Sequence, residues 1–405
     1  MNRNKQGRGE GLSLSKTGGG IHYSLIQAFF WMAYCGGTGF SSTYLLSVGF
    51  DNARIGVLIA LSGILAALLQ PVVAGAIDRS GKRLLKPVIL SGILVAVGLS
   101  LLLLAVPGSL WLFCGICFAG NLSVLQLLIP LINSLSICGR ERERISFGFS
   151  RAIGSLAYAG ISYVLGRMIA GFGMELLSVM RILAFLALAC GVAAFPVNYS
   201  QQEESAGEEA GTGGFFERYG GFPVLMAGCF LLYLCHSFLT YYNYQIVLSK
   251  GGDEQSYGAV IALAAVLELP VMFGFTKMLQ RAAASRWFLL SGIGYILKAV
   301  TALLSPNMTV YYLVQLFQMF AWAMITVASV CYVKEITREE DSTRGQAYIT
   351  LSYTVAMAVG SVSGGILLQL LGTETLLVLA SLFAAVGTLV LRKGIRKTEE
   401  GLSSI

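Results

Sequence analysis

Long apolar runs separated by short polar segments dominate the chain. A helix needs about 20 residues to cross the hydrocarbon core of a bilayer. Strands of a membrane barrel would be about half as long and would alternate strictly between apolar and polar positions. The pattern therefore predicts an all-α membrane protein with twelve transmembrane helices. They are expected over residues 21–47, 54–77, 87–106, 109–137, 148–170, 176–197, 222–248, 257–280, 287–305, 309–333, 346–370 and 375–391.

Composition agrees with a membrane setting. Of the 405 residues, 56% are hydrophobic and 12% are charged, whereas a soluble domain carries about 25% charged residues. These values exclude an ordinary soluble enzyme, a disordered protein and a nucleic-acid binder. The formal net charge of +7 is interpreted as an orientation signal, because Lys and Arg collect in cytoplasmic loops. The expected surroundings are a lipid bilayer, with no nucleic-acid partner.

Basic residues alternate between the two sides of the predicted helices. If residues 1–20 form a cytoplasmic tail, most Lys and Arg fall in cytoplasmic loops, and the outer loops clearly hold only Arg54 and Lys250. An even number of crossings then returns the tail at 392–405 to the cytoplasm. We expect an integral protein of a bacterial-type cytoplasmic (plasma) membrane, with both termini inside.

One long polar stretch divides the chain. Residues 198–221 are rich in Gly, Ser and Glu, a composition typical of flexible linkers. They separate a half of six predicted helices at 21–197 from a second half at 222–391. The linker is expected on the cytoplasmic side.

The two halves also resemble each other in sequence. Residues 71–75 (PVVAG) match residues 270–274 (PVMFG), and residues 173–177 (GMELL) match residues 372–376 (GTETL), both at an offset of 199. Two matches at one offset favour a duplicated six-helix unit. Duplicated halves with a binding site between them are the architecture of many secondary transporters.

The segment after the second predicted helix carries a recognisable motif. Its members follow a G-x-x-x-D-R-x-G-R-R pattern, with Ala74 at the first glycine. This resembles the signature loop of the major facilitator superfamily. The resemblance implies two six-helix halves and a cytoplasmic gate in this loop. The expected gate residues are Asp78, Arg79, Gly81, Lys82 and Arg83.

Within that superfamily, residues 130–158 resemble the oligosaccharide–proton symporters, the lactose permease-like branch. The resemblance implies that Arg151 binds sugar hydroxyls and that Tyr158 stacks on the sugar. Asn133, also expected to bind substrate, stands where that branch carries the Glu that partners this Arg, a departure that argues against a galactoside. Gln315 and Gln318 replace proton-coupling residues, a pattern closer to a branch that includes phenylpropionate carriers.

One opposite pair of charges is expected near the membrane midplane. Glu268 lies about 12 residues from either end of its predicted helix, roughly 18 Å along the axis, and Lys298 is similarly central in the next helix. An unpaired charge at that depth costs at least about 3 kcal/mol. The pair is interpreted either as a proton-coupling site, with Lys298 stabilising ionised Glu268, or as a permanent structural ion pair.

Polar and aromatic residues gather in three predicted helices. Aromatic faces can stack on sugars or rings, while amides and hydroxyls orient them; interfacial tyrosines and helix packing are the structural alternative. Arg167, Glu175 and Arg181 are expected at outer helix ends as interface anchors or an outer gate. The further substrate-binding candidates are Tyr34, Tyr44, Tyr241, Asn243, Tyr244, Gln315, Gln318 and Trp322.

The sequence thus predicts a secondary active transporter that works by alternating access. A small sugar, glycoside or similar polar ring compound is the leading substrate, carried with protons by a monomer. Efflux of amphipathic drugs and uptake of aromatic carboxylates or nucleosides are the alternatives. No cofactor or metal is expected beyond the proton gradient. An enzyme is disfavoured because no nucleophile–base spacing occurs and only two histidines are present.

Overall fold

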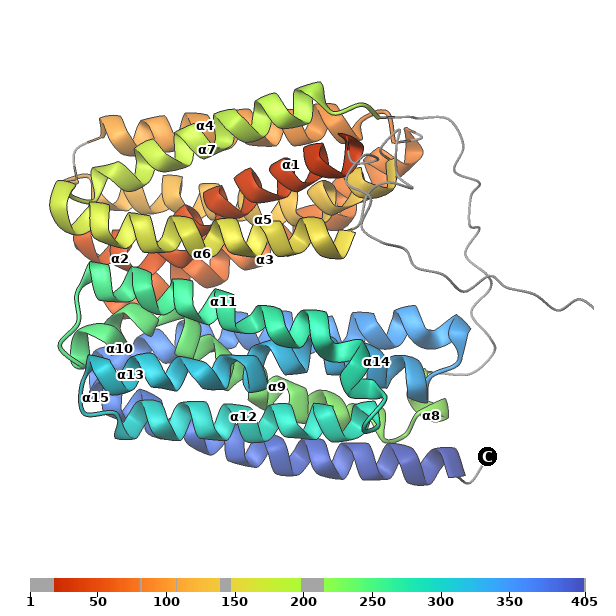
Figure 1. Ribbon diagram of the computed structural model, residues 1–405. Helices are drawn as coiled ribbons and strands as arrows, with labels where there is room; N and C mark the ends of the chain where they lie inside the picture. The colour runs from red at the N-terminus through yellow and green to blue at the C-terminus, as the bar shows by residue number, and fades with distance from the viewer. Residues whose placement is uncertain (1–17, 81, 107, 139–146, 198–214, 404–405) are drawn as a thin grey trace, which may run out of the picture.

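The computed structural model describes residues 18–80, 82–106, 108–138, 147–197, 215–403. One bundle contains the helices of the first part of the chain, drawn in the upper part of Figure 1. Apolar residues fill these helices on nearly every face, as expected of segments surrounded by lipid and by each other. Its helices are α1 (Gly18–Tyr34), the π-helical turn η2 (Cys35–Gly39), α2 (Ser41–Ser47), α3 (Asn52–Arg79), α4 (Leu85–Ala105), α5 (Trp111–Cys138), α6 (Phe147–Phe172) and α7 (Glu175–Ala194).

The second bundle lies below the first in Figure 1. Its helices are α8 (Phe215–Arg218), α9 (Phe222–Tyr241), α10 (Asn243–Ser249), α11 (Glu254–Leu279), α12 (Ala284–Leu304), α13 (Met308–Val314), the 3₁₀ turn η4 (Gln315–Gln318), the π-helical turn η5 (Met319–Ala323), α14 (Met324–Ile336) and α15 (Glu339–Ser403). The first bundle meets the second chiefly through α3 against α15 and α6 against α11.

Ten helical segments in the described part of the chain are long and apolar enough to cross a membrane. The prediction of an all-α membrane fold is confirmed. A count of twelve crossings takes α1, η2 and α2 as one crossing and α15 as two. Gly372 divides α15 with a φ of 79°, a left-handed conformation that glycine adopts without a steric penalty.

The two bundles repeat the same backbone features. Gly173, between α6 and α7, has a φ of 88° and matches Gly372 at the offset seen in the sequence. Two further positions also correspond. The first long crossing breaks at Phe40 (φ −105°, ψ 21°) and the seventh segment breaks at Tyr242 (φ −107°, ψ 17°). Such recurrence at equivalent points supports a duplicated unit.

The bundles are joined at one end, called here the closed end, where α3 and α11 begin. Side-chain hydrogen bonds join described residues of the two bundles there. Asn52 accepts a bond from Gln245 Nε2 at 2.9 Å and donates its backbone N–H to Gln369. Ser42 Oγ donates to the Tyr241 carbonyl at 2.5 Å. These bonds keep the bundles together at the closed end.

Close backbone packing accompanies these bonds. A Cβ on Gly166 in α6 would lie 2.8 Å from Gly258 Cα in α11, so neither position has room for a side chain. Small residues allow membrane helices to approach closely. Replacing either glycine would push α6 and α11 apart.

Two segments expected as linker or tail are helical and packed. Residues 215–221 contain α8, whose Arg218 pairs with Asp341 at the start of α15. This hydrogen bond and the nearby negative charge raise the pKa of Arg218. The helix α15 continues through 392–403, and its Gly394 packs against Leu225 of α9. Residues 1–17, 198–214 and 404–405 of the predicted tails and linker lie outside the described residues.

Candidate functional site

Three side chains from neighbouring helices form what we call the bridged cluster: Glu268 of α11, Lys298 of α12 and Gln318 of η4. Gln318 Nε2 donates to Glu268 Oε1 at 2.8 Å. Lys298 Nζ donates to Gln318 Oε1. The Gln318 amide thus donates through its nitrogen to the Glu268 carboxylate and accepts through its oxygen from the Lys298 ammonium. The expected contact between the two charges is mediated by Gln318.

The local backbone explains how Gln318 reaches both charges. Between α13 and α14 the helix tightens into η4 and then widens into η5. Such changes of helix type alter the direction of the side chains and are frequent at functional sites. Lys298 is only 7% exposed and Glu268 is half-buried. The bridge lets a buried base and an acid share one neutral amide without direct contact.

Arg151 of α6 occupies a different kind of setting in the first bundle. Its guanidinium lies 3.7 Å from the ring centroid of Trp31 in α1, a cation–π contact. Its Nη1 donates to Ser155 Oγ at 2.9 Å, one turn along α6. We call Arg151, Trp31 and Ser155 the cation–π cluster. The carboxylate that attracts Arg151 electrostatically belongs to the other bundle and is that of Glu268.

A chain of amides and hydroxyls fixes Trp31. Its Nε1 donates to Gln27 Oε1 at 2.9 Å, and Gln27 Nε2 donates to Tyr23 OH at 2.7 Å and to Asn133 Oδ1 at 3.3 Å. Asn133, predicted beside Arg151, therefore connects to it through Gln27 and Trp31. Where the symporter branch carries a Glu, this chain has the neutral amide of Asn133, which is linked to the Trp31 indole through Gln27.

A second aromatic surface belongs to the second bundle. Trp322 of η5 stacks on His236 of α9, with centroids 4.2 Å apart and planes 8° apart. Tyr353 of α15 lies 5.6 Å from Trp322. His236 Nε2 lies 3.4 Å from Thr240 Oγ1. The orientation of Trp322, a predicted substrate residue, is thus fixed by stacking on His236. In the first bundle, the predicted substrate residue Tyr34 packs on Trp31, with ring centroids 4.9 Å apart.

The other aromatic and amide candidates lie toward the closed end. Asn243 accepts a bond from Tyr311 OH at 2.8 Å, Gln315 donates to the Tyr311 carbonyl, and Tyr244 donates to Glu254. A Cβ on Gly39 would lie 2.9 Å from Tyr158 OH, so Tyr158 packs beside η2.

Two tyrosine candidates have mainly structural contacts. Tyr241 accepts the Ser42 bond at the closed end through its carbonyl. Tyr44 stacks on Phe118 at 4.8 Å inside the first bundle and is 6% exposed. The structure therefore brings only part of the predicted set together with the bridged cluster.

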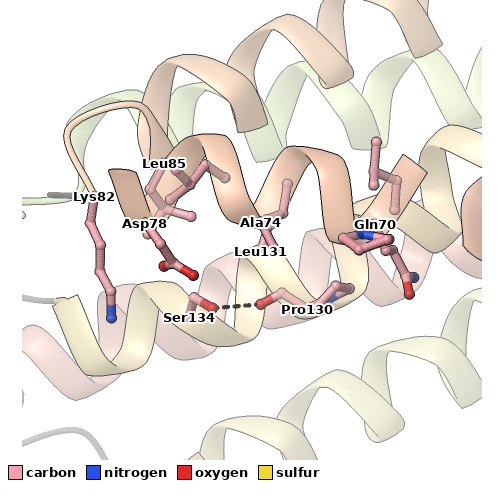
Figure 2. A pocket seen from close by; sticks show the side chains of 11 residues that line it. Gln70, Ala74, Asp78, Lys82, Leu85, Pro130, Leu131 and Ser134 are labelled. Carbon is pink, nitrogen blue, oxygen red and sulfur yellow. Dashed lines mark hydrogen bonds between the residues drawn. The ribbon is translucent and has the colours of Figure 1, made fainter. Parts of the chain in front are cut away.

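The predicted gate residues flank a cavity at the opposite end. A cavity of about 440 Å³ lies between α3 and α5, and both Asp78 and Lys82 line it. Figure 2 shows the carboxylate of Asp78 directed toward α5. Arg79 and Arg83 are exposed. Gly81 lies outside the described residues, and Lys82 itself takes the left-handed conformation of the turn (φ 63°).

Sequence reasoning missed Trp31, Gln27 and the role of His236 beside Trp322. A signal for the first two existed: Gln27 and Trp31 stand four residues apart on one helix, the spacing at which side chains meet. No comparable signal could pair His236 with Trp322, because 86 positions separate them.

These features define a membrane transporter of the major facilitator type. The chain belongs to the MFS_1 like family, whose family model matches residues 21–378. No curated protein sequence matches the chain. The resemblance to the superfamily is confirmed, while the oligosaccharide or phenylpropionate branch stays a prediction.

Solved transporter structures share this fold. A mutant of the nucleoside transporter NupG superposes with a TM-score of 0.77 at 13% identity, covering 94% of this chain and 100% of that one. A bacterial homologue of the iron transporter ferroportin, in an inward-facing state, gives 0.67 at 15%, covering 93% and 98%. A mutant of the peptide transporter POT gives 0.67 at 12%, covering 97% and 96%. At such identities the likeness concerns the fold.

Proposed function

We propose that the protein is a proton-coupled symporter of a small sugar, glycoside or similar polar ring compound. The observation that carries this proposal is the bridged cluster, in which one carboxylate is hydrogen-bonded to an amide and attracted to Arg151 of the other bundle. A site whose acid acts on both bundles can link proton uptake to their relative movement.

The proposed cycle depends on the charge of Glu268. While ionised, Glu268 attracts Arg151 and accepts from Gln318. Protonation removes that attraction and leaves the Arg151 guanidinium to donate to substrate hydroxyls. Lys298 remains hydrogen-bonded to Gln318 Oε1 throughout. A proton moved across 100 mV supplies about 2.3 kcal/mol, enough for a substrate gradient of roughly 50-fold.

The proposed substrate is a ring with hydroxyls. Trp31 and Trp322 offer one indole face in each bundle, and ring substrates stack on such faces. Arg151 supplies several donors for hydroxyl oxygens.

We further propose that both termini are cytoplasmic, since basic residues concentrate on that side. The closed end then faces outward, and the α3–α4 turn with Asp78 and Lys82 faces the cytoplasm. The two halves rock about the central clusters, and the hydrogen bonds of Asn52 and Ser42 break when the outer side opens. The proposed unit is a monomer.

The test is transport in proteoliposomes with Glu268→Gln. A thermal-shift panel of sugars, glycosides, nucleosides and aromatic acids first selects the substrate. In the variant we expect uphill uptake driven by a pH gradient to vanish, while exchange of labelled for unlabelled substrate persists, because only the proton step needs the acid. Glu254→Gln, the same change on the same helix at the closed end, should keep uphill uptake. Undiminished uphill uptake in Glu268→Gln would refute the proposal.

A further inference from the structure

Arg181 of α7 is a buried cation that the transport site does not use. Its side chain is 1% exposed, and only Nη2 has a hydrogen-bond partner, Ser178 Oγ at 3.1 Å. Its Nε and Nη1 are buried and have no acceptor. Arg181 is therefore buried inside the first bundle and is not an exposed anchor at the end of its helix. A buried donor without an acceptor costs about 1–3 kcal/mol, and more when charged.

No carboxylate neutralises Arg181 from within its bundle. Among the described residues of the first bundle the acids are Asp51, Asp78 and Glu175, which lie at helix ends and are exposed or half-exposed. Its other close neighbours are rings: the guanidinium carbon lies 5.0 Å from the Phe118 centroid and 5.8 Å from that of Tyr44. These π-faces offset part of the charge, yet they accept no conventional hydrogen bond.

Arg181 also lines a cavity of about 200 Å³. The other lining residues come from α1, η2, α6 and α7 and are apolar, among them Met32, Leu165 and Ala187. Leu183, also in the lining, is 55% exposed on the outer face of α7, where lipid surrounds the helix. The cavity thus combines one cation with apolar walls and a lipid-facing side.

The depth of Arg181 suits a ligand that enters from the bilayer. Arg181 follows the first residue of α7 by six positions, or roughly 9 Å along the helix. An amphipathic group bound at a membrane interface buries its apolar part by about 5–10 Å, a similar distance. A small soluble anion would gain nothing from the apolar walls, whereas an acyl chain would fill them.

We propose that this cavity binds the ionised carboxylate of a long-chain fatty acid, with the carboxylate on Arg181 and the acyl chain between α1, α6 and α7. Hydrogen bonds between guanidinium and carboxylate are among the strong ones in proteins. Gly36 in η2 packs directly on the stem of Arg181: a Cβ there would lie 2.7 Å from Arg181 Cγ, so a side chain at this position would displace the arginine. The bound lipid would rest beside η2, whose Gly39 carbonyl accepts from Tyr257 of the other bundle.

Binding of tritiated oleate to the purified full chain tests the proposal. We expect Arg181→Gln to weaken oleate binding at least about tenfold, equivalent to about 1.4 kcal/mol. Arg167→Gln is the matched control, because Arg167 is an exposed arginine on α6 bonded to Tyr163, and it should bind oleate like the parent. Methyl oleate, which lacks the charge, should not compete, and neither should acetate, which lacks the chain.

A second variant keeps the test decisive if Arg181→Gln does not fold. Ala187→Phe fills a half-buried wall of the cavity without touching the charge, and it should weaken oleate binding by a similar factor. Equal binding to parent and Arg181→Gln, or to parent and Ala187→Phe, would overturn the proposal. So would competition by methyl oleate or acetate at concentrations comparable with oleate.

Discussion

Each bundle carries a basic side chain in one of its clusters, Lys298 in the second and Arg151 in the first, and the partners of the two side chains differ. Lys298 in the second bundle has an amide partner that is itself bonded to a carboxylate, so base and acid are linked within one bundle. Arg151 in the first bundle rests on Trp31 and bonds to Ser155. The carboxylate of Glu268 attracts it from across the interface.

This difference indicates which cluster changes during transport. The bridged cluster satisfies its charges internally, so rigid-body movement of the bundles leaves its hydrogen bonds intact. The cation–π cluster exchanges its distant partner whenever the bundles move apart or Glu268 is protonated. Under the proposed mechanism, charge storage belongs to the second bundle and substrate capture to the first.

The largest effect is expected from Gln318→Leu. Leucine has a similar size but leaves the Lys298 ammonium and the Glu268 carboxylate without their shared partner, at a cost of about 2 kcal/mol or more. We expect a clear loss of thermal stability and no uphill uptake. Gln346→Leu is the control, because Gln346 lies outside the bridged cluster and the predicted substrate residues, and its amide donates to the Val330 carbonyl at 2.9 Å. Equal losses in the two variants would mean that the bridge has no special role.

A smaller effect on stability and a selective effect on binding are expected from Arg151→Lys. Lysine keeps the charge but loses the planar group that stacks on Trp31 and donates in several directions. Substrate affinity, measured by the thermal-shift panel, should fall about tenfold, while the melting temperature stays close to the parent value. Arg167→Lys, the same change on the outer part of α6, should alter neither. Unchanged affinity in Arg151→Lys would remove substrate capture from the first bundle.

The sequence predicted much of the fold because a bilayer restricts the choices. Run length located the helices, and the shared offset of residues 173–177 and 372–376 identified a repeat that both positive-φ glycines support. The helical and packed segments at 215–221 and 392–403 were missed, since their polar composition resembles that of linkers and tails. Their burial depends on contacts such as Arg218 with Asp341, which are 123 positions apart.

Part of the candidate site could be predicted for the same reason. Rare charges at depth are visible in a sequence, so Glu268 and Lys298 could be found by elimination. The role of Gln318 between them could not be predicted. Gln318 reaches both charges because of two irregular turns, η4 and η5, which no local sequence pattern indicates. Arg181 was misjudged because its distance from the helix end suggested exposure, whereas the packing of α1 and α7 covers it.

The smallest effect is expected from Trp31→Phe, which keeps an aromatic ring at this position but removes the hydrogen bond that the indole donates to Gln27. Phenylalanine keeps an aromatic face for Arg151 but loses the Nε1 bond to Gln27 and has a weaker cation–π attraction. A cost of about 0.5–1 kcal/mol corresponds to a two- to fivefold loss of substrate affinity. Trp111→Phe is the control, because Trp111 forms a cation–π contact with Arg54 at the closed end, at 4.9 Å. A matching loss there would show that cation–π contacts anywhere in the first bundle affect affinity, and the distinction between the two clusters would fail. No loss in Trp31→Phe would instead leave Ser155 as the group that positions the guanidinium.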